Sequence, residues 1–295
     1  MSSSGRFGYL YVALSSICFA VSGTASKFLF NQGVTPYQLV QIRTVIASAV
    51  LLAWLSVTDS ASLRIARQSL PLLILLGFVL AATMFTYFYA ISKIQVAAAI
   101  LLQYQSPVLV AAYALAFSGE RHSTATLIAI AGSCVGCYLA VGAYTLDLLS
   151  LNKAGIIGGL SAAAFLAGYT VLSESALRRH KPWTVLFYAS LFSAATCNIL
   201  LPPFEGLTRS YNATQWFWIL FISIVGTAVS LGLYNKGLRL IRSTHASVTA
   251  TLQPIAAAVI AFLFLDEIMR PWQVVGIILV VASIILLQIG KEKRS

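Results

Sequence analysis

Apolar residues along the chain gather into long runs, which are separated by short stretches that carry charge, proline or turn-forming residues. A helix that spans a membrane needs about 20 mostly apolar residues, and the runs have this length. The pattern predicts an all-α membrane protein. We expect ten transmembrane helices at about 8–30, 36–58, 69–92, 96–117, 123–143, 154–177, 183–203, 214–235, 244–265 and 271–290.

Composition and charge support this prediction. Of the 295 residues, 59% are apolar and 9% are charged, whereas about a quarter of the residues in a soluble domain are charged. The net charge of +11 does not predict a nucleic-acid partner, because the basic residues lie between the runs instead of on one face. Cytoplasmic loops of membrane proteins carry an excess of lysine and arginine. With both termini in the cytoplasm, the loops on the cytoplasmic side carry most of the basic residues, and only Lys93, Lys153, Arg209 and Arg270 lie in outer loops.

The sequence also repeats itself. Shifting the chain by 147 residues aligns its two halves without a gap over long stretches, and it superposes Gly8 on Gly155, Tyr87 on Tyr234, Ile94 on Ile241, Pro107 on Pro254 and Glu120 on Glu267. We therefore expect two five-helix units, at 1–147 and 148–295. Because five is odd, the second unit is inverted in the membrane, as is typical of secondary transporters that work by alternating access. A channel or an assembly factor built from duplicated helices is the alternative.

Several segments resemble a known family. They are an arginine in the second run (GVTPYQLVQIRTVIASAVLL), the run YFYAISKIQVAAAILLQYQSPVLV, and the acidic ends SGE and LDE. With the duplicated five-helix plan, they resemble the EamA-type members of the drug/metabolite transporter superfamily over nearly the whole chain. On overall likeness, the chain resembles the amino-acid exporters of that family, including the aromatic amino-acid group. The resemblance implies a multi-pass protein of the bacterial cytoplasmic (inner) membrane.

The two prolines mark the predicted site. A proline inside a helix frees the carbonyl four residues earlier, which here belongs to Gln103 or Ala250. Polar backbone at membrane depth is tolerated where it faces protein or a wet cavity. We expect the runs that contain Pro107 and Pro254 to be kinked helices that form equivalent walls of one central cavity. Packing kinks with no cavity are the alternative.

Helical spacing adds further walls to this cavity. Side chains spaced three or four residues apart lie on one face of a helix, and such faces recur in the other runs. We expect the substrate-binding cavity to be lined by Ser15, Phe19, Ser22, Thr83, Tyr87, Gln103, Ser106, Tyr169, Ser230, Tyr234 and Gln253. Stripes of serine and threonine also allow helices to approach closely, and this alternative stays open.

Arg43 lies well inside the second run, where an arginine costs about 2.5–3.5 kcal/mol on insertion scales. It could hold a substrate carboxylate, bond carbonyls of a neighbouring helix, or reach the outer rim. The resemblance includes this arginine in members with dissimilar substrates. It therefore favours a structural or gating role, together with the two prolines.

Several other functions are disfavoured by the sequence. None of the acidic residues falls at the middle of a run, so the intramembrane carboxylate of many proton-driven transporters is absent. Catalytic motifs such as HExxH, GxSxG and a Walker A lysine are also absent. Cys134 and Cys137 form a CxxC, but they lie beside Gly132 and Gly136, whose spacing is typical of close helix packing. We expect no enzyme activity, no cofactor and no metal.

The combined expectation is an exporter of small amphipathic metabolites that works by alternating access, with aromatic and neutral amino acids as the preferred class. Export is expected to be downhill, or coupled in a way that needs no buried acid. An exporter of hydrophobic drugs is the alternative within transport. A membrane scaffold is the alternative from another class. A homo-oligomer is compatible with the sequence.

Overall fold

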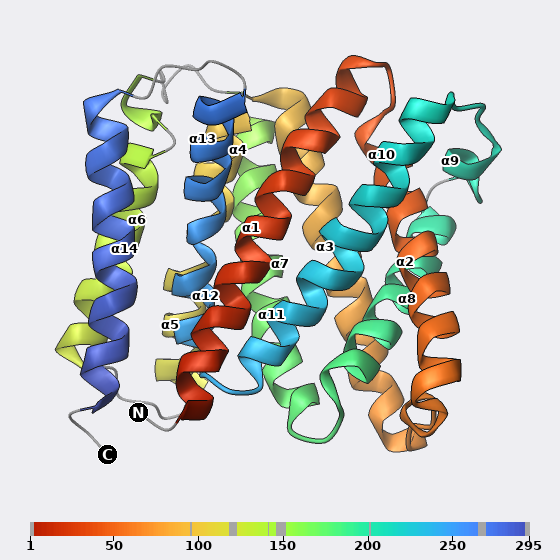
Figure 1. Ribbon diagram of the computed structural model, residues 1–295, viewed down its shortest axis with the longest axis horizontal. Coiled ribbons are helices and arrows are strands. Elements are labelled where there is room, and N and C mark those ends of the chain that lie inside the picture. The colour runs from red at the N-terminus through yellow and green to blue at the C-terminus, as the bar shows by residue number, and fades with distance from the viewer. Residues whose placement is uncertain are drawn as a thin grey trace.

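The computed structural model describes residues 3–94, 96–117, 123–140, 142–145, 152–200, 202–264 and 270–292. These residues form helices joined by short connections, and they contain no β-strand. The elements are α1 Ser3–Asn31, α2 Pro36–Thr58, η1 Ser60–Leu63, η2 Arg67–Ser69, α3 Leu70–Lys93, α4 Val96–Gln103, α5 Ser106–Phe117, α6 Thr124–Ala140, η3 Ala143–Thr145, α7 Lys153–Leu177, α8 Pro182–Leu200, α9 Glu205–Thr208, α10 Ala213–Ser223, η4 Ile224–Val229, α11 Ser230–Leu238, α12 Ser243–Ala250, α13 Leu252–Phe264 and α14 Pro271–Glu292 (Figure 1).

Several segments of the bundle are long and apolar enough to cross a membrane. Within the described residues, seven segments meet this criterion, and 124–140 and 271–287 are shorter apolar helices. The remaining predicted span, 244–265, is divided at Thr251 into α12 and α13. The chain is a helical, multi-pass membrane protein. The seven segments are Gly5–Asn31, Pro36–Thr58, Arg67–Ile91, Ala98–Phe117, Lys153–Leu177, Pro182–Leu200 and Ala213–Leu238.

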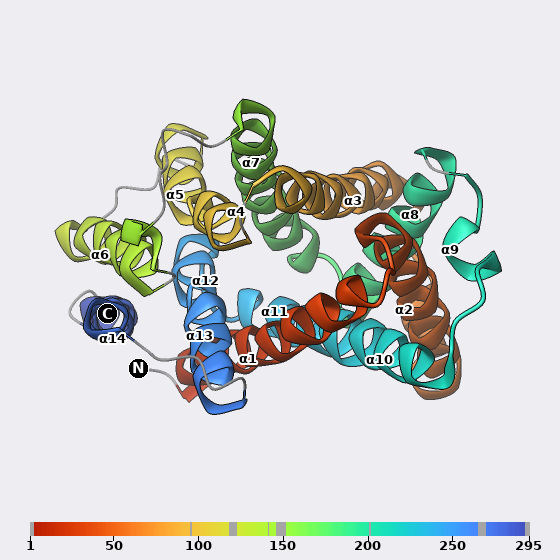
Figure 2. The ribbon, with the colours of Figure 1, turned by 90° about the horizontal axis from the view of Figure 1, so that it is seen from above.

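The helices form an elongated bundle. Seen from above, α1, α10 and α11 lie along one side, and α3 and α7 lie along the other (Figure 2). Helix α3 packs against α7 and α8, α1 packs against α11 and α13, and α2 packs against α8. Helices α6 and α14 pack against each other at one end (Figure 2). Helix α1 begins and α14 ends at the same end of the bundle (Figure 1).

The outer surface is apolar, and much of the buried interior is polar. On α1, Leu10, Leu14 and Ile17 are about half exposed, whereas Ser15 and Ser22 are buried. The exposed side chains suit lipid tails. Ser15 Oγ donates to the carbonyl of Ser230 and Ser26 Oγ donates to the carbonyl of Ser22, so these hydroxyls find partners within the protein instead of in lipid. The sequence pattern therefore separates a lipid face from an interior that contains polar groups.

Glycines allow α6 and α14 to approach closely. A methyl group on Gly136 would lie 2.9 Å from the carbonyl oxygen of Gly276, and one on Gly276 would lie 2.6 Å from the carbonyl oxygen of Gly136. Gly132 likewise faces Ser283 at short distance. The GxxxG spacing of Gly132 and Gly136 therefore marks a helix contact. Cys134 and Cys137 are free thiols on the same helix.

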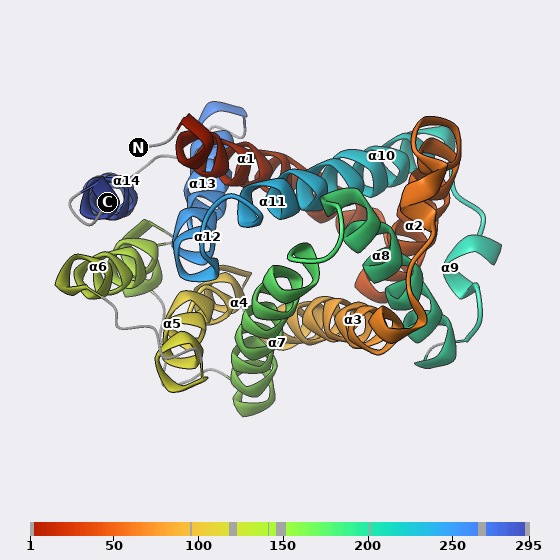
Figure 3. The same ribbon diagram turned by 90° about the horizontal axis from the view of Figure 1, so that it is seen from below.

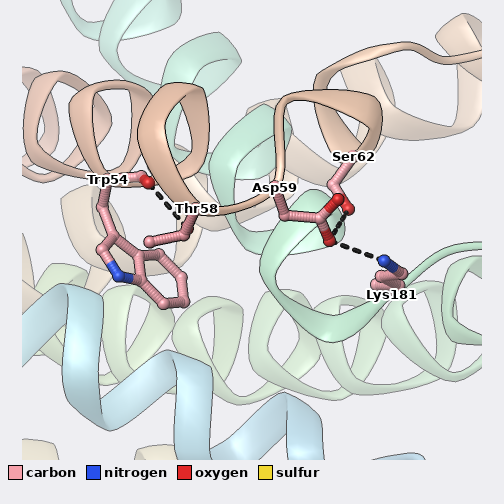
Figure 4. A network of polar contacts seen from close by, with 5 residues as sticks. All are labelled: Trp54, Thr58, Asp59, Ser62 and Lys181. Atoms are coloured by element: carbon pink, nitrogen blue, oxygen red, sulfur yellow. Dashed lines mark hydrogen bonds and ion pairs between the residues drawn. The ribbon is translucent and has the colours of Figure 1, made fainter.

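The connection between α2 and α3 is tied to the start of α8. The Asp59 carboxylate accepts hydrogen bonds from the Ser62 hydroxyl and from Lys181 Nζ, each at 2.6 Å (Figure 4). Trp54 and Trp183 cross edge to face, with their ring centroids 4.8 Å apart. The hydrogen bond from Lys181, followed by that from Ser62, lowers the pKa of Asp59 below its ordinary value of 3.8.

Some predicted features lie outside the described residues. They are Glu120 and Glu267, the acidic residues that the shift of 147 residues superposes.

We predict that Gly276→Ala destabilises the contact between α6 and α14. The added methyl group has no room, and overpacking of this kind costs about 1–3 kcal/mol. The apparent melting temperature of the purified protein in detergent should fall. Gly23→Ala is the matched control, because a methyl group there would meet nothing within 4 Å. Equal melting temperatures for the two variants would contradict the contact.

We also predict a pH-dependent contribution from Asp59. A lowered pKa means that the carboxylate stabilises the fold above its ordinary pKa of 3.8 and that this contribution is lost as the pH falls through the lowered value. Asp59→Asn should therefore lower the melting temperature near neutral pH by a few degrees at most, because the pair is exposed. The difference from the wild type should vanish in acid. A difference that persists at a pH below the lowered pKa would contradict this assignment.

Candidate functional site

A cavity of about 350 Å³ lies inside the bundle. The helices that line it are α1, α2, α3, α4, α5, α7, α11, α12 and α13. Helix α11, which forms part of the wall, contacts both α1 and α7 (Figure 3). The lining is mostly apolar and aromatic, with scattered hydroxyl and amide groups, as is usual for small-molecule sites. Its aromatic members are Phe19, Phe30, Tyr87, Phe88, Tyr104, Tyr169 and Tyr234.

The structure brings most of the predicted cavity residues together around this space. Those that border it are Ser15, Phe19, Ser22, Thr83, Tyr87, Gln103, Ser106, Tyr169, Tyr234 and Gln253. Pro254 and Arg43 also border it, whereas Pro107 does not. Ser230 is fully buried but is not part of the lining. Its hydroxyl donates to the carbonyl of Val225, and its own carbonyl accepts from Ser15 Oγ at 2.8 Å.

We expected a kinked helix at each of the two prolines, but the structure has two separate helices at each place. Helix α4 ends at Gln103, and α5 begins at Ser106, so Pro107 is the second residue of a new helix. In the same way, α12 ends at Ala250, and Pro254 lies in the first turn of α13. Proline is tolerated in a first turn because the backbone N–H groups there have no partner within the helix. Both prolines therefore start helices at the depth of the cavity.

A hydrogen bond connects the two interruptions. Tyr104, in the turn between α4 and α5, donates its hydroxyl to Gln253 Oε1 near the start of α13. Both residues border the cavity. A second contact joins α7 to α11, where the hydroxyls of Thr170 and Tyr234 are 2.9 Å apart. The bond between Tyr104 and Gln253 thus links the first half of the chain to the second, whereas the contact between Thr170 and Tyr234 lies within the second half.

Helix α10 continues into α11 through a π-helical turn, η4. Such turns often occur at functional sites, because the wider turn changes which carbonyls are bonded within the helix. Here Arg43 from α2 donates from Nε to Thr227 Oγ1 at 2.9 Å and from Nη2 to the carbonyl oxygen of Gly226 at 3.0 Å. Arg43 therefore bonds a carbonyl of a neighbouring helical segment, which is one of the three roles that the sequence left open. Its side chain is 6% exposed and borders the cavity.

Sequence reasoning missed several lining residues. Tyr104, Phe88 and Thr170 border the cavity, and they directly follow the predicted members Gln103, Tyr87 and Tyr169. A strict helical stripe excludes adjacent residues. Interrupted helices and a cavity wider than one stripe allow both neighbours to reach it. The helix interruption beside the proline was the available signal for Tyr104.

The lining offers several kinds of group that can bind a small molecule. The described part of the chain contains no group of three or more histidine, cysteine or acidic side chains that could hold a metal ion. The lining side chains offer aromatic faces, hydroxyls, amides and one guanidinium. These groups can surround a small amphipathic molecule and orient its polar end.

We predict that Tyr104→Phe and Gln253→Leu are energetically coupled. Side-chain hydrogen bonds between membrane helices contribute about 0.5–1.5 kcal/mol. The double variant should therefore lose less stability than the sum of the two single losses. Melting temperatures of the four proteins in detergent measure this coupling. Tyr113→Phe, on the exposed side of α5, serves as a control, and purely additive losses would contradict the contact.

Comparison with known proteins assigns the chain to a family. The model of the EamA-like transporter family matches residues 6–142 and again residues 153–289. An uncharacterized transporter of Archaeoglobus fulgidus is 29% identical over 95% of this chain and 96% of its own length. The uncharacterized inner membrane transporter YicL of Salmonella typhimurium is 24% identical over 99% and 98%. The pseudopaline exporter CntI of Pseudomonas aeruginosa is 25% identical over 97% and 98%.

A solved crystal structure has the same fold. It superposes on the whole of this chain and of its own chain with a TM-score of 0.79, at 18% sequence identity. The family matches and this superposition agree with the helical, membrane-spanning architecture of the bundle. The chain belongs to the EamA-like transporter family.

Proposed function

We propose that this transporter exports small amphipathic metabolites, with neutral and aromatic amino acids as its substrates, from the cytoplasm across a bacterial inner membrane. The main support for this proposal is the cavity of about 350 Å³, whose walls combine aromatic rings with scattered hydroxyl and amide groups. Such walls suit a solute with an apolar body and a polar end. A related protein named as a pseudopaline exporter supports export of a metabolite.

The proposed architecture is ten spanning segments in two inverted five-helix repeats, residues 1–147 and 148–295. Several observations support it. The family model matches the two halves separately, and α4 and α12 begin 147 residues apart and have equal length. Packing follows the same relation, because α3 packs against α7 while α1 packs against α11. Alternating access around the shared cavity is the mechanism that such a plan serves.

Individual contacts support the repeat as well. Gly8 packs against Ile241, and Gly155 packs against Ile94. A shift of 147 residues turns the first contact into the second. The proposed orientation has both termini in the cytoplasm, and the excess of basic residues in the connections that would then face inward supports it. The two termini are also on the same side, because α1 begins where α14 ends (Figure 1).

The proposal favours facilitated transport over proton-driven transport. None of the described residues that line the cavity is an aspartate, glutamate or histidine, so no lining side chain could carry a proton in the neutral pH range. The direct test is efflux of radiolabelled amino acids from preloaded proteoliposomes, with and without an imposed pH gradient. Efflux that is independent of the gradient supports the proposal. An absence of efflux from folded protein overturns the amino-acid substrate and directs the search to hydrophobic drugs.

We predict that Tyr87→Ala and Gln103→Ala slow this efflux by about tenfold each, which corresponds to ~1.4 kcal/mol in the activation free energy of transport. Each substitution removes a side chain that lines the cavity. Tyr113→Ala is the matched control, because this tyrosine is 43% exposed and does not border the cavity. Unchanged efflux in both cavity variants would remove the site.

A further inference from the structure

Arg43 is the charged residue of the cavity wall. The described residues that border the cavity include no aspartate, glutamate, lysine or histidine. The described part of the wall therefore carries one formal positive charge and no formal negative charge. A protein interior screens charge much less than water does, so this charge strongly affects which solutes bind.

The guanidinium is partly satisfied by neutral groups. Of its five N–H donors, one on Nε bonds Thr227 Oγ1 and one on Nη2 bonds the carbonyl oxygen of Gly226. Within the described residues, no hydrogen bond is made by Nη1. The two neutral partners fix the plane of the guanidinium against η4, and the remaining donors are available to a bound solute.

The described acidic side chains bind other partners. Asp59 pairs with Lys181, Glu174 pairs with Arg178, and Glu205 accepts from Gln38 Nε2. None of these three carboxylates borders the cavity. The charge of Arg43 is therefore balanced by no acid in the described part of the wall.

We infer that Arg43 is the anion subsite of the cavity and that it binds the carboxylate of the transported solute. A guanidinium presents paired N–H groups that match a carboxylate, and aromatic side chains elsewhere in the wall receive the apolar body. The described lining offers no carboxylate to an ammonium group, so the solute does not need an ammonium group in order to bind. The substrate class is apolar or aromatic monocarboxylates, of which neutral amino acids are members, and cations are excluded.

This inference rests on the proposed function of the cavity, and its test keeps the two apart. Binding to purified wild-type protein in detergent is measured by calorimetry for four probes with the same aromatic body: 3-phenylpropanoate, L-phenylalanine, 3-phenylpropan-1-ol and L-phenylalaninamide. The two carboxylates should bind at least about tenfold more tightly than the cationic amide, which is the effect of one charge-assisted hydrogen bond. The alcohol should lie between them.

The outcomes are distinct. If the amide binds as tightly as the two carboxylates, the anion subsite is overturned, while the amphipathic cavity stands. If none of the four probes binds to folded protein, the proposed function itself fails, and the subsite fails with it. The wild-type series needs no variant, so it decides the question even if changes at Arg43 impair folding.

Two variants then locate the effect. Arg43→Gln should reduce the preference for carboxylate over amide by about tenfold. Thr227→Val removes one neutral partner of the guanidinium but keeps its charge, so the preference should persist. Retention of the full preference in Arg43→Gln would show that another group recognises the carboxylate, and it would overturn the assignment. Size-exclusion profiles and melting temperatures establish that each variant is folded.

Discussion

Backbone polar groups inside a membrane must find partners within the protein, because lipid tails offer none. Long helices satisfy this requirement by themselves, and most of the described chain consists of them. The helical ladder changes at Tyr104 and Gln105, at Thr251, and at the π-helical turn η4. Each change lies beside the cavity wall, where protein groups complete the bonding. The requirement for internal partners therefore places irregular backbone in the interior, where it can serve a solute.

Packing around this interior depends on small residues. At the end of the bundle, α6 and α14 approach until their glycine backbones are in contact. Within the bundle, a methyl group on Gly226 would collide with Ser22, so α1 lies directly against the turn that Arg43 bonds. Helices are in close contact at one end of the bundle and beside the cavity, and aromatic side chains line the cavity itself.

Much of the fold could be predicted from the sequence because hydropathy and the repeat act over long segments. The helices begin and end close to the predicted limits, and stripes on α1 and α3 place their residues around the cavity. Details that depend on tertiary contacts could not be predicted. One of the two partners of Arg43 is the backbone carbonyl of Gly226, a group that any residue could supply. The π-helical turn ends directly before Ser230 and alters the local register, so this serine bonds Val225 instead of lining the cavity.

The contacts of Gly8 with Ile241 and of Gly155 with Ile94 bear on the relative free energies of the inward-open and outward-open states. If an exchange of conformations between the halves drives transport, each contact takes the place of the other in the opposite state. A substitution at one glycine alone then has a different cost in the two states, whereas the same substitution at both has nearly equal costs. Sequence divergence between the halves can thus set which face of the membrane the empty transporter favours, without altering any group that touches the solute.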